Sequence, residues 1–334
     1  MNFSTFLSLP VETFADKFMK CGRILIFQHI PKTAGSSLAR EMRLTLPPYA
    51  NIHVPAEDYA EHLGEADPMD VATETFLAEE SSKQFRSASG HMLARHMKKL
   101  REALPYAAVF TVLRDPVARV ISDYRYSLTP QYPLHEDFRL RFPVIEAYVD
   151  CEDFQNTMWQ ATRTQQEQEA SPDAIARVFE NLMFIGIVED LNLHFEFLTA
   201  LMGYPKTMET HHNVTVESDI NKIEITDGLR EYITETNAED VSLYAAVRGR
   251  LAEKRDEIVA FVDARRAQYT HVVTPVENKD MEMILIEAIC HSIRDVPALK
   301  NGRGDKRSPR AKAVSLVRRM KRTGFSFSRT LGIL

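Results

Sequence analysis

The chain has 334 residues, of which 44% are hydrophobic and 26% are charged, and its formal net charge is −6. This is an ordinary globular composition, long enough for one large domain or two smaller ones. No run approaches the roughly 20 apolar residues that a membrane span needs, and the first ten residues lack the pattern of a secretory signal. We therefore expect a soluble, cytoplasmic protein.

The three cysteines, Cys21, Cys151 and Cys290, are far apart in the sequence and form no CxxC or Cys/His cluster. An odd number of such residues argues against a disulfide framework, and their spacing gives no zinc motif. We expect free thiols and no metal site.

Three nearly continuous apolar runs predict strands, at residues 23–30, 107–113 and 182–188. Continuous rather than alternating apolar residues favour strands that are covered on both faces of a parallel sheet. A predicted helix follows each run, at residues 36–46, 116–128 and 191–202. Repeated strand–loop–helix units predict an α/β sandwich, in which ligands bind at the carboxyl ends of the strands.

The stretch 130–181 is polar and mostly helical in pattern, which predicts a helical insertion. After residue 202 the chain has a helical pattern, longest over 238–268 and present again over 277–293. A loop is expected over 203–221, with His211, His212 and Asn213 in it. These patterns predict a single domain over 1–297 with a helical C-terminal portion.

The remaining segment, 298–334, contains eleven Lys or Arg and one acid, Asp305, so the rest of the chain is strongly acidic. Its first half contains Gly302, Gly304 and Pro309, which favour a flexible linker. Over 311–324, apolar residues at helical spacing lie between basic ones, as in a basic amphipathic helix that binds an anionic surface. A solvated tail that aids solubility is the alternative.

The loop after the first predicted strand reads HIPKTAGSSL, from His29 to Leu38. Backbone N–H groups of such a loop, the N-terminus of the following helix and Lys32 can surround one anion. The pattern is not Walker A, because Lys32 precedes the loop and no GK[ST] is present. The alternative is that Lys32 lies on the surface and that Ser36 and Ser37 only cap the helix.

The segment after the second strand has the same build and reads RDPVARVISDY, beginning at Arg114. An Arg at the carboxyl end of a buried strand can grip a phosphate with both guanidinium arms, and the Ser122 hydroxyl can complete the site. A local ion pair between Arg119 and Asp115 that merely caps the helix is the alternative.

Together these two segments resemble the PAPS-dependent sulfotransferases, which use 3′-phosphoadenosine 5′-phosphosulfate as donor. The likeness is greatest to the carbohydrate group typified by heparan sulfate and uronyl 2-O-sulfotransferases. Family members carry a HIPKT-x-GS/T-S loop and an RDP-x-x-R-x-x-S-x-Y segment, and this chain has both in the same order. The recognisable likeness covers 29–126. Weaker echoes, FIGIVEDLNLHFEFL and AEDVSLY among them, extend to about residue 250.

The resemblance implies a three-layer, P-loop-like sandwich with a donor-binding core over about 23–202. It implies that Lys32 contacts the 5′-phosphosulfate and that Arg114 and Ser122 hold the 3′-phosphate. The loop around the phosphosulfate would comprise Thr33, Ala34, Gly35, Ser36 and Ser37. The expected product is the desulfated nucleotide PAP, and no metal is required.

A catalytic His on a Gly-His segment between the two motifs is a further family feature, and Gly90-His91 occupies that place here. An imidazole suits removal of a hydroxyl proton at neutral pH. The alternatives are a structural role for His91, His96 as the base, or a Glu base. We expect His29 to be structural.

The expected reaction is in-line sulfuryl transfer to an acceptor hydroxyl. The resemblance implies that this hydroxyl belongs to a carbohydrate or glycoconjugate, and we expect no nucleic-acid partner. Acceptor contacts are expected from the 130–181 insertion and the loop around His211. Three basic residues after His91 offer either an anionic acceptor site or a solvated helix face, namely Arg95, Lys98 and Lys99. The competing functions are a nucleotide-dependent phosphoryl-transfer enzyme and an inactive nucleotide-binding scaffold.

Overall fold

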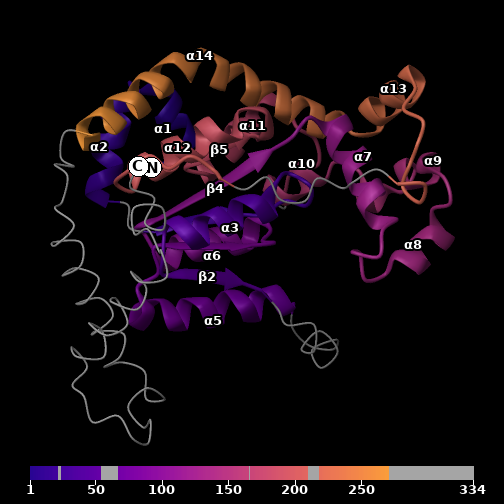
Figure 1. Cartoon of the computed structure of the whole chain (residues 1–334), viewed down its shortest axis with the longest axis horizontal. Helices are drawn as coiled ribbons and strands as arrows, with labels where there is room; N and C mark the ends of the chain where they lie inside the picture. Colours follow the sequence, from indigo (N-terminus) through magenta and orange to yellow (C-terminus); the bar gives the residue numbers. More distant parts are fainter. Residues whose placement is uncertain (22–23, 54–66, 165, 210–217, 271–334) are drawn as a thin grey trace, which may run out of the picture. The chain divides into compact units, whose positions relative to one another are not determined.

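A computed structural model describes residues 1–21, 24–53, 67–164, 166–209 and 218–270. At its centre is a five-stranded sheet in the order β2-β3-β1-β4-β5, in which all four pairings are parallel (Figure 1). The strands are β1 (Ile24–Gln28), β2 (Tyr49–Ile52), β3 (Ser87–Gly90), β4 (Ala107–Leu113) and β5 (Phe184–Ile187). The three predicted strand regions are therefore confirmed as β1, β4 and β5.

Helices cover both faces of this sheet. Every residue of β1, β3 and β5 is buried, and successive side chains of a strand point to opposite faces, so neither face is open to solvent. Each strand of the predicted units leads into a helix, α3 (Gly35–Thr45), α7 (Pro116–Ser127) and α12 (Leu191–Leu201). The expected three-layer, P-loop-like sandwich is confirmed.

Two short strands, β2 and β3, were not predicted from the sequence. β3 has the sequence SASG, which carries no strand-like apolar pattern. Its buried hydroxyls are nevertheless satisfied: Ser87 Oγ donates to the Leu46 carbonyl at 2.8 Å, and Ser89 Oγ shares a hydrogen bond of 2.6 Å with Tyr49. These bonds allow a polar strand to lie inside the sheet.

The insertion after β4 is helical, as predicted. Its helices are α8 (His135–Arg141), α9 (Ile145–Val149), α10 (Thr157–Thr162) and α11 (Pro172–Asn181). Together with α7 and α13 (Asp227–Thr236), α8 and α9 form a second apolar cluster that includes Tyr124, Phe138, Tyr148 and Ile233. In Figure 1 these four helices gather at the right-hand end of the sheet.

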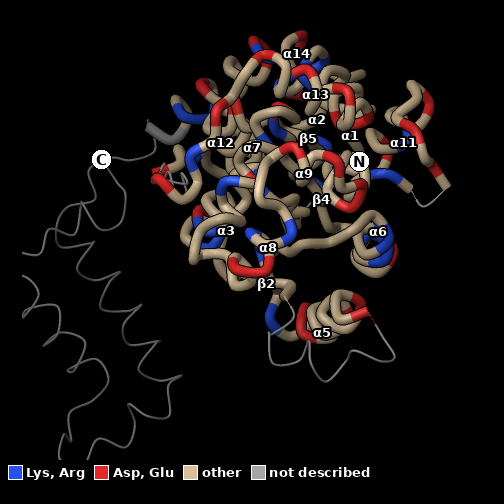
Figure 2. The backbone as a smooth tube through the Cα atoms, turned by 90° about the vertical axis from the view of Figure 1, so that its right-hand side faces the viewer, with Lys and Arg blue, Asp and Glu red and all other residues tan. Residues whose placement is uncertain are grey.

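The other described helices surround the main core. They are α1 (Phe3–Ser8), α2 (Val11–Cys21), α5 (Pro68–Lys83), α6 (Ala94–Ala103) and the long α14 (Ala238–Thr270), which confirms the helix predicted over 238–268. The charges of α5 are mostly acidic and those of α6 mostly basic, whereas α14 carries both signs along its length (Figure 2). None of the helices among the described residues is long and apolar enough to cross a bilayer.

Contacts divide the chain into two compact units, Met1–Ala267 and Gln268–Leu334. The predicted helix over 277–293, the basic tail 298–334 and Cys290 lie outside the described residues, and so do His211, His212 and Asn213. Cys21 is exposed, Cys151 is half-buried, and both are free thiols, as expected.

Candidate active site

A cleft of about 1240 Å³ lies at the carboxyl ends of the central strands. It collects residues that directly follow β1, β3, β4 and β5, as the topology of a parallel sheet requires. Eight of the nine predicted site residues line it, namely Lys32, Ala34, Gly35, Ser36, Ser37, His91, Arg114 and Ser122. Thr33 does not line it.

The loop between β1 and α3 has an unusual backbone. Lys32 and Ala34 both have positive φ angles, 67° and 63°, which non-glycine residues seldom adopt. Helix α3 begins at Gly35, and no side chain caps it at Ala34. The alternative that Ser36 and Ser37 only cap this helix is therefore wrong, because they are its second and third residues. The uncapped N-terminus faces the cleft and suits an anion.

Thr33 has a structural role in this loop. Its side chain is fully buried, and its hydroxyl donates to the Ile30 carbonyl at 3.0 Å. The bond closes the turn from inside, so Thr33 shapes the loop without presenting its hydroxyl to a ligand.

The two predicted phosphate-binding segments meet at Lys32. Arg114 Nη1 donates to the Lys32 carbonyl at 3.1 Å, which ties the end of β4 to the loop after β1. The Lys32 ammonium lies 3.8 Å from the centre of the Tyr126 ring, within cation–π range. Burial lowers the pKa of Lys32, while nearby Asp123 acts in the opposite direction.

Helix α7 shows that the suggested Arg119–Asp115 pair does not form. Asp115 caps the helix by accepting from the Ala118 N–H at 2.9 Å. Arg119 is fully buried and pairs with Asp123 at 3.2 Å. Asp123 Oδ2 also accepts from the Tyr148 hydroxyl at 3.0 Å, so this carboxylate joins α7 to the insertion.

A buried carboxylate, Asp240 of α14, belongs to the same network. It accepts from the N–H groups of Trp159 at 2.7 Å and Met158 at 3.2 Å, and Arg119 lies 3.9 Å away. Burial raises the pKa of Asp240, and Arg119 opposes that rise. Since the Arg114 N–H contacts Met158 Sδ at 3.4 Å, the network helps to fix the end of β4.

His91 follows β3 directly and opens into the cleft. Its ring stacks on that of His29, with centroids 4.0 Å apart and an interplanar angle of 29°. Desolvation by the surrounding protein lowers the pKa of His91. A neutral imidazole is the form that can accept a proton.

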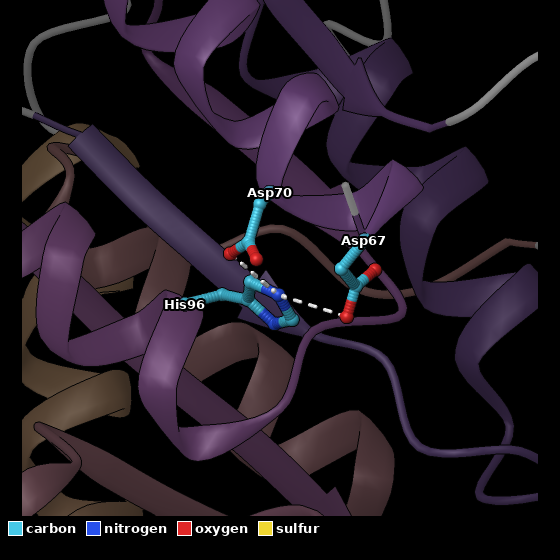
Figure 3. Close-up of side chains that lie close together, drawn as sticks. All are labelled: Asp67, Asp70 and His96. Carbon is cyan, nitrogen blue, oxygen red and sulfur yellow. Dashed lines mark ion pairs between the residues drawn. The ribbon is translucent and has the colours of Figure 1, made fainter. Parts of the chain in front are cut away.

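His96, the alternative base, does not line the cleft. It lies in a cluster with Asp67 and Asp70 (Figure 3). The Leu93 N–H donates to His96 Nδ1 at 3.0 Å, so the ring proton is on Nε2, 3.2 Å from Asp70 Oδ1. If a metal bound Nε2, that nitrogen would have to lose its proton while Nδ1 still accepted the Leu93 N–H. The ring would then carry no proton on either nitrogen. The hydrogen bonding therefore fits a neutral His96 that lies beside Asp70, and not a metal site.

The basic residues after His91 are paired with acids. Arg95 pairs with Asp67, Lys98 Nζ lies 3.9 Å from Glu102, and Lys99 Nζ lies 2.6 Å from Glu74. None of the three basic residues lines the cleft. Their arrangement corresponds to the solvated helix face and not to an acceptor site.

Sequence reasoning missed several residues of the cleft. Tyr126 could have been found, because it lies one helical turn after Ser122 on the same face of α7. Arg230 and Arg255 also line the cleft, from α13 and α14. They are over a hundred residues from Lys32 in the sequence, and no local pattern marks them.

The chain is a parallel α/β sandwich of the P-loop-like kind. The helix N-terminus, Lys32 and Arg114 at its strand ends form an arrangement that suits an anionic ligand. The model of the sulfotransferase family matches residues 18–245, and the chain belongs to this family. The crystal structure of a sulfotransferase from Alicyclobacillus acidocaldarius is similar at 16% identity and a TM-score of 0.40, covering 68% of this chain and 96% of that one. A comparison with curated proteins finds no match.

Proposed function

We propose that the protein transfers a sulfuryl group from PAPS to an acceptor hydroxyl, on a carbohydrate or glycoconjugate, with His91 as general base. The observation that carries this proposal is the hydrogen bond from Arg114 to the Lys32 carbonyl. It brings two anion-binding segments from neighbouring strands into one cleft, as a donor with phosphates at both its 3′ and 5′ positions requires.

The donor end of the cleft has a defined division of roles in this proposal. Lys32, the first N–H groups of α3 and the hydroxyls of Ser36 and Ser37 hold the 5′-phosphosulfate. Arg114 and Ser122 hold the 3′-phosphate. PAPS supplies an activated sulfuryl group and leaves as PAP. Lys32 and the helix N-terminus offset the negative charge that develops on the leaving phosphate.

The acceptor end is where the hydroxyl loses its proton. His91 is exposed and lines the cleft beside the loop. The insertion contributes Tyr132, Phe138 and Phe154 to the lining. Flat aromatic faces with a few polar groups suit the apolar face of a sugar ring, and holding donor and acceptor in line is the remaining task.

A labelled-PAPS transfer screen over glycans, lipids and small phenols tests the activity and identifies the acceptor class. Thermal shift provides the binding test: we expect PAP to stabilise the protein, and ATP with magnesium to have little effect. Stabilisation by ATP and not by PAP would indicate a phosphoryl-transfer enzyme. Binding of PAP with no transfer to any acceptor would indicate a nucleotide-binding scaffold.

The roles of the two phosphate sites can be separated with a matched ligand. Adenosine 5′-phosphosulfate lacks the 3′-phosphate, so Arg114→Ala should weaken binding of PAPS more than binding of this analogue. An equal loss for both ligands would show that Arg114 acts only through its bond to the loop.

A further inference from the structure

His91 stands at the end of a column of aromatic rings that begins in the core. Phe110 stacks on Phe27 with centroids 5.2 Å apart, Phe27 on His29 at 5.6 Å, and His29 on His91 at 4.0 Å. The parallel register explains the column. Phe27 pairs with Phe110 across the sheet, and the pairing of Gln28 with Gly90 brings the next residues, His29 and His91, side by side.

The backbone around His91 is held from β1. The His29 N–H donates to the Gly90 carbonyl at 2.9 Å, and Gln28 Nε2 donates to the Met92 carbonyl at 2.8 Å. Both residues next to His91 are therefore bonded to the end of β1. Little freedom remains for the His91 segment to move relative to His29.

The other side of the His29 ring contacts the donor loop. A Cβ atom on Gly35 would lie 1.7 Å from His29 Cδ2 and 1.9 Å from Nε2. The ring thus fills the space where a side chain at position 35 would lie. His29 is in contact with both the start of α3 and the proposed base.

Desolvation lowers the pKa of His91 and so favours the neutral imidazole, the form that can accept a proton. The titratable groups that face the pair are Lys32 of the loop and His53 after β2, and both lower the pKa of the imidazole that they face.

We propose that His29 is a positioning residue, whose ring sets the plane of the His91 imidazole. The inference rests on the proposed function, in which His91 removes the acceptor proton. His29 does not touch the reacting atoms in this scheme. Its contact with Gly35 makes the position of the base depend on the position of the donor loop.

The test compares His29→Phe, which keeps a flat ring in the column, with His29→Ala, which removes it. Histidine NMR follows the titration of His91 in both variants, and PAP binding verifies the donor site. We expect His29→Ala to raise the pKa of His91 toward its ordinary 6.5, because part of its burial is lost. The acid limb of the kcat/KM profile should move to higher pH with it, and kcat should fall roughly tenfold or more. His29→Phe should keep the pKa of His91, and with it the acid limb, close to the wild-type value, and should restore most of kcat.

The inference is wrong if His91 titrates identically in the wild-type protein and in His29→Ala, or if His29→Phe is as impaired as His29→Ala. His91→Ala tests the proposed function separately. If that variant keeps wild-type turnover, His91 is not the base. The NMR titrations still decide whether His29 controls the His91 ring, because they do not depend on activity.

Discussion

Gly35→Ala is predicted to break the contact between the donor loop and His29. The new Cβ would lie 1.7 Å from His29 Cδ2, whereas ordinary carbon contacts are about 3.5–4.0 Å. The ring or the start of α3 must therefore move by about 2 Å. Overpacking of this kind costs about 1–3 kcal/mol of unfolding free energy. The displaced ring should also lose its stack on His91, so kcat should fall with stability.

A double-mutant cycle measures this clash directly by urea denaturation. In a His29→Ala background the space is open, and Ala is a better helix residue than Gly by up to about 1 kcal/mol. Gly35→Ala should then be neutral or slightly stabilising. The coupling between the two positions should be about 1–3 kcal/mol, with the double variant more stable than additivity predicts.

Gly249→Ala is the matched control, because Gly249 lies in the middle of α14 and a Cβ there meets nothing within 4 Å. It should leave kcat unchanged and stabilise the protein slightly. The reasoning is refuted if Gly35→Ala has the same effect on stability with and without the His29 ring.

Three further predictions concern the cations, the buried carboxylate and pH. Lys32→Ala should lower kcat by about 10²–10³-fold with little change in unfolding free energy, whereas Lys98→Ala, at a position with a 70% exposed side chain, should leave transfer unchanged. Asp240→Ala should lower the free energy of unfolding, measured by thermal denaturation, by about 3–5 kcal/mol, because the buried Arg119 guanidinium loses one of its carboxylates. As a control, Glu253→Ala removes one partner of a surface ion pair and should lower it by at most about 1 kcal/mol. Burial lowers the pKa of His194 to about 4, so the folded state binds fewer protons than the unfolded state between pH 4 and 6.5. Stability should therefore fall by about 1.4 kcal/mol per pH unit as the pH drops through that window, and His194→Gln should flatten the slope in urea titrations.

The residues of the candidate donor site could be picked out from the sequence because their signals are local. The structure brings them together in one cleft, and their roles stay a prediction. A buried strand, a loop of small residues and a helix start follow one another within 29–38, and the same order recurs at Arg114. The expected capping role of the serines was wrong, because the positive φ of Ala34 starts α3 one residue earlier. The residue types of this loop do not indicate that Ala34 adopts a positive φ angle.

The base was a different kind of prediction. Gly90-His91 was chosen by resemblance, while the strand before it has a sequence, SASG, that resembles a loop. Only the paired strand explains why His91 lies in the cleft: β3 lies between β1 and β2, and its buried hydroxyls are bonded to neighbouring backbone and side chains. The role of His91 as the base stays a prediction.

The sequence by itself determined the class of fold and the position of the Lys32 loop, because continuous apolar strands and helix starts are properties of short segments. The tertiary structure decided which charges share one site. In the folded chain, Arg114 is hydrogen-bonded to the Lys32 carbonyl, Arg119 is paired with Asp123 and Asp240, and His96 lies outside the cleft. Such pairings depend on strand order and on side-chain burial between segments distant in sequence. No local pattern records either.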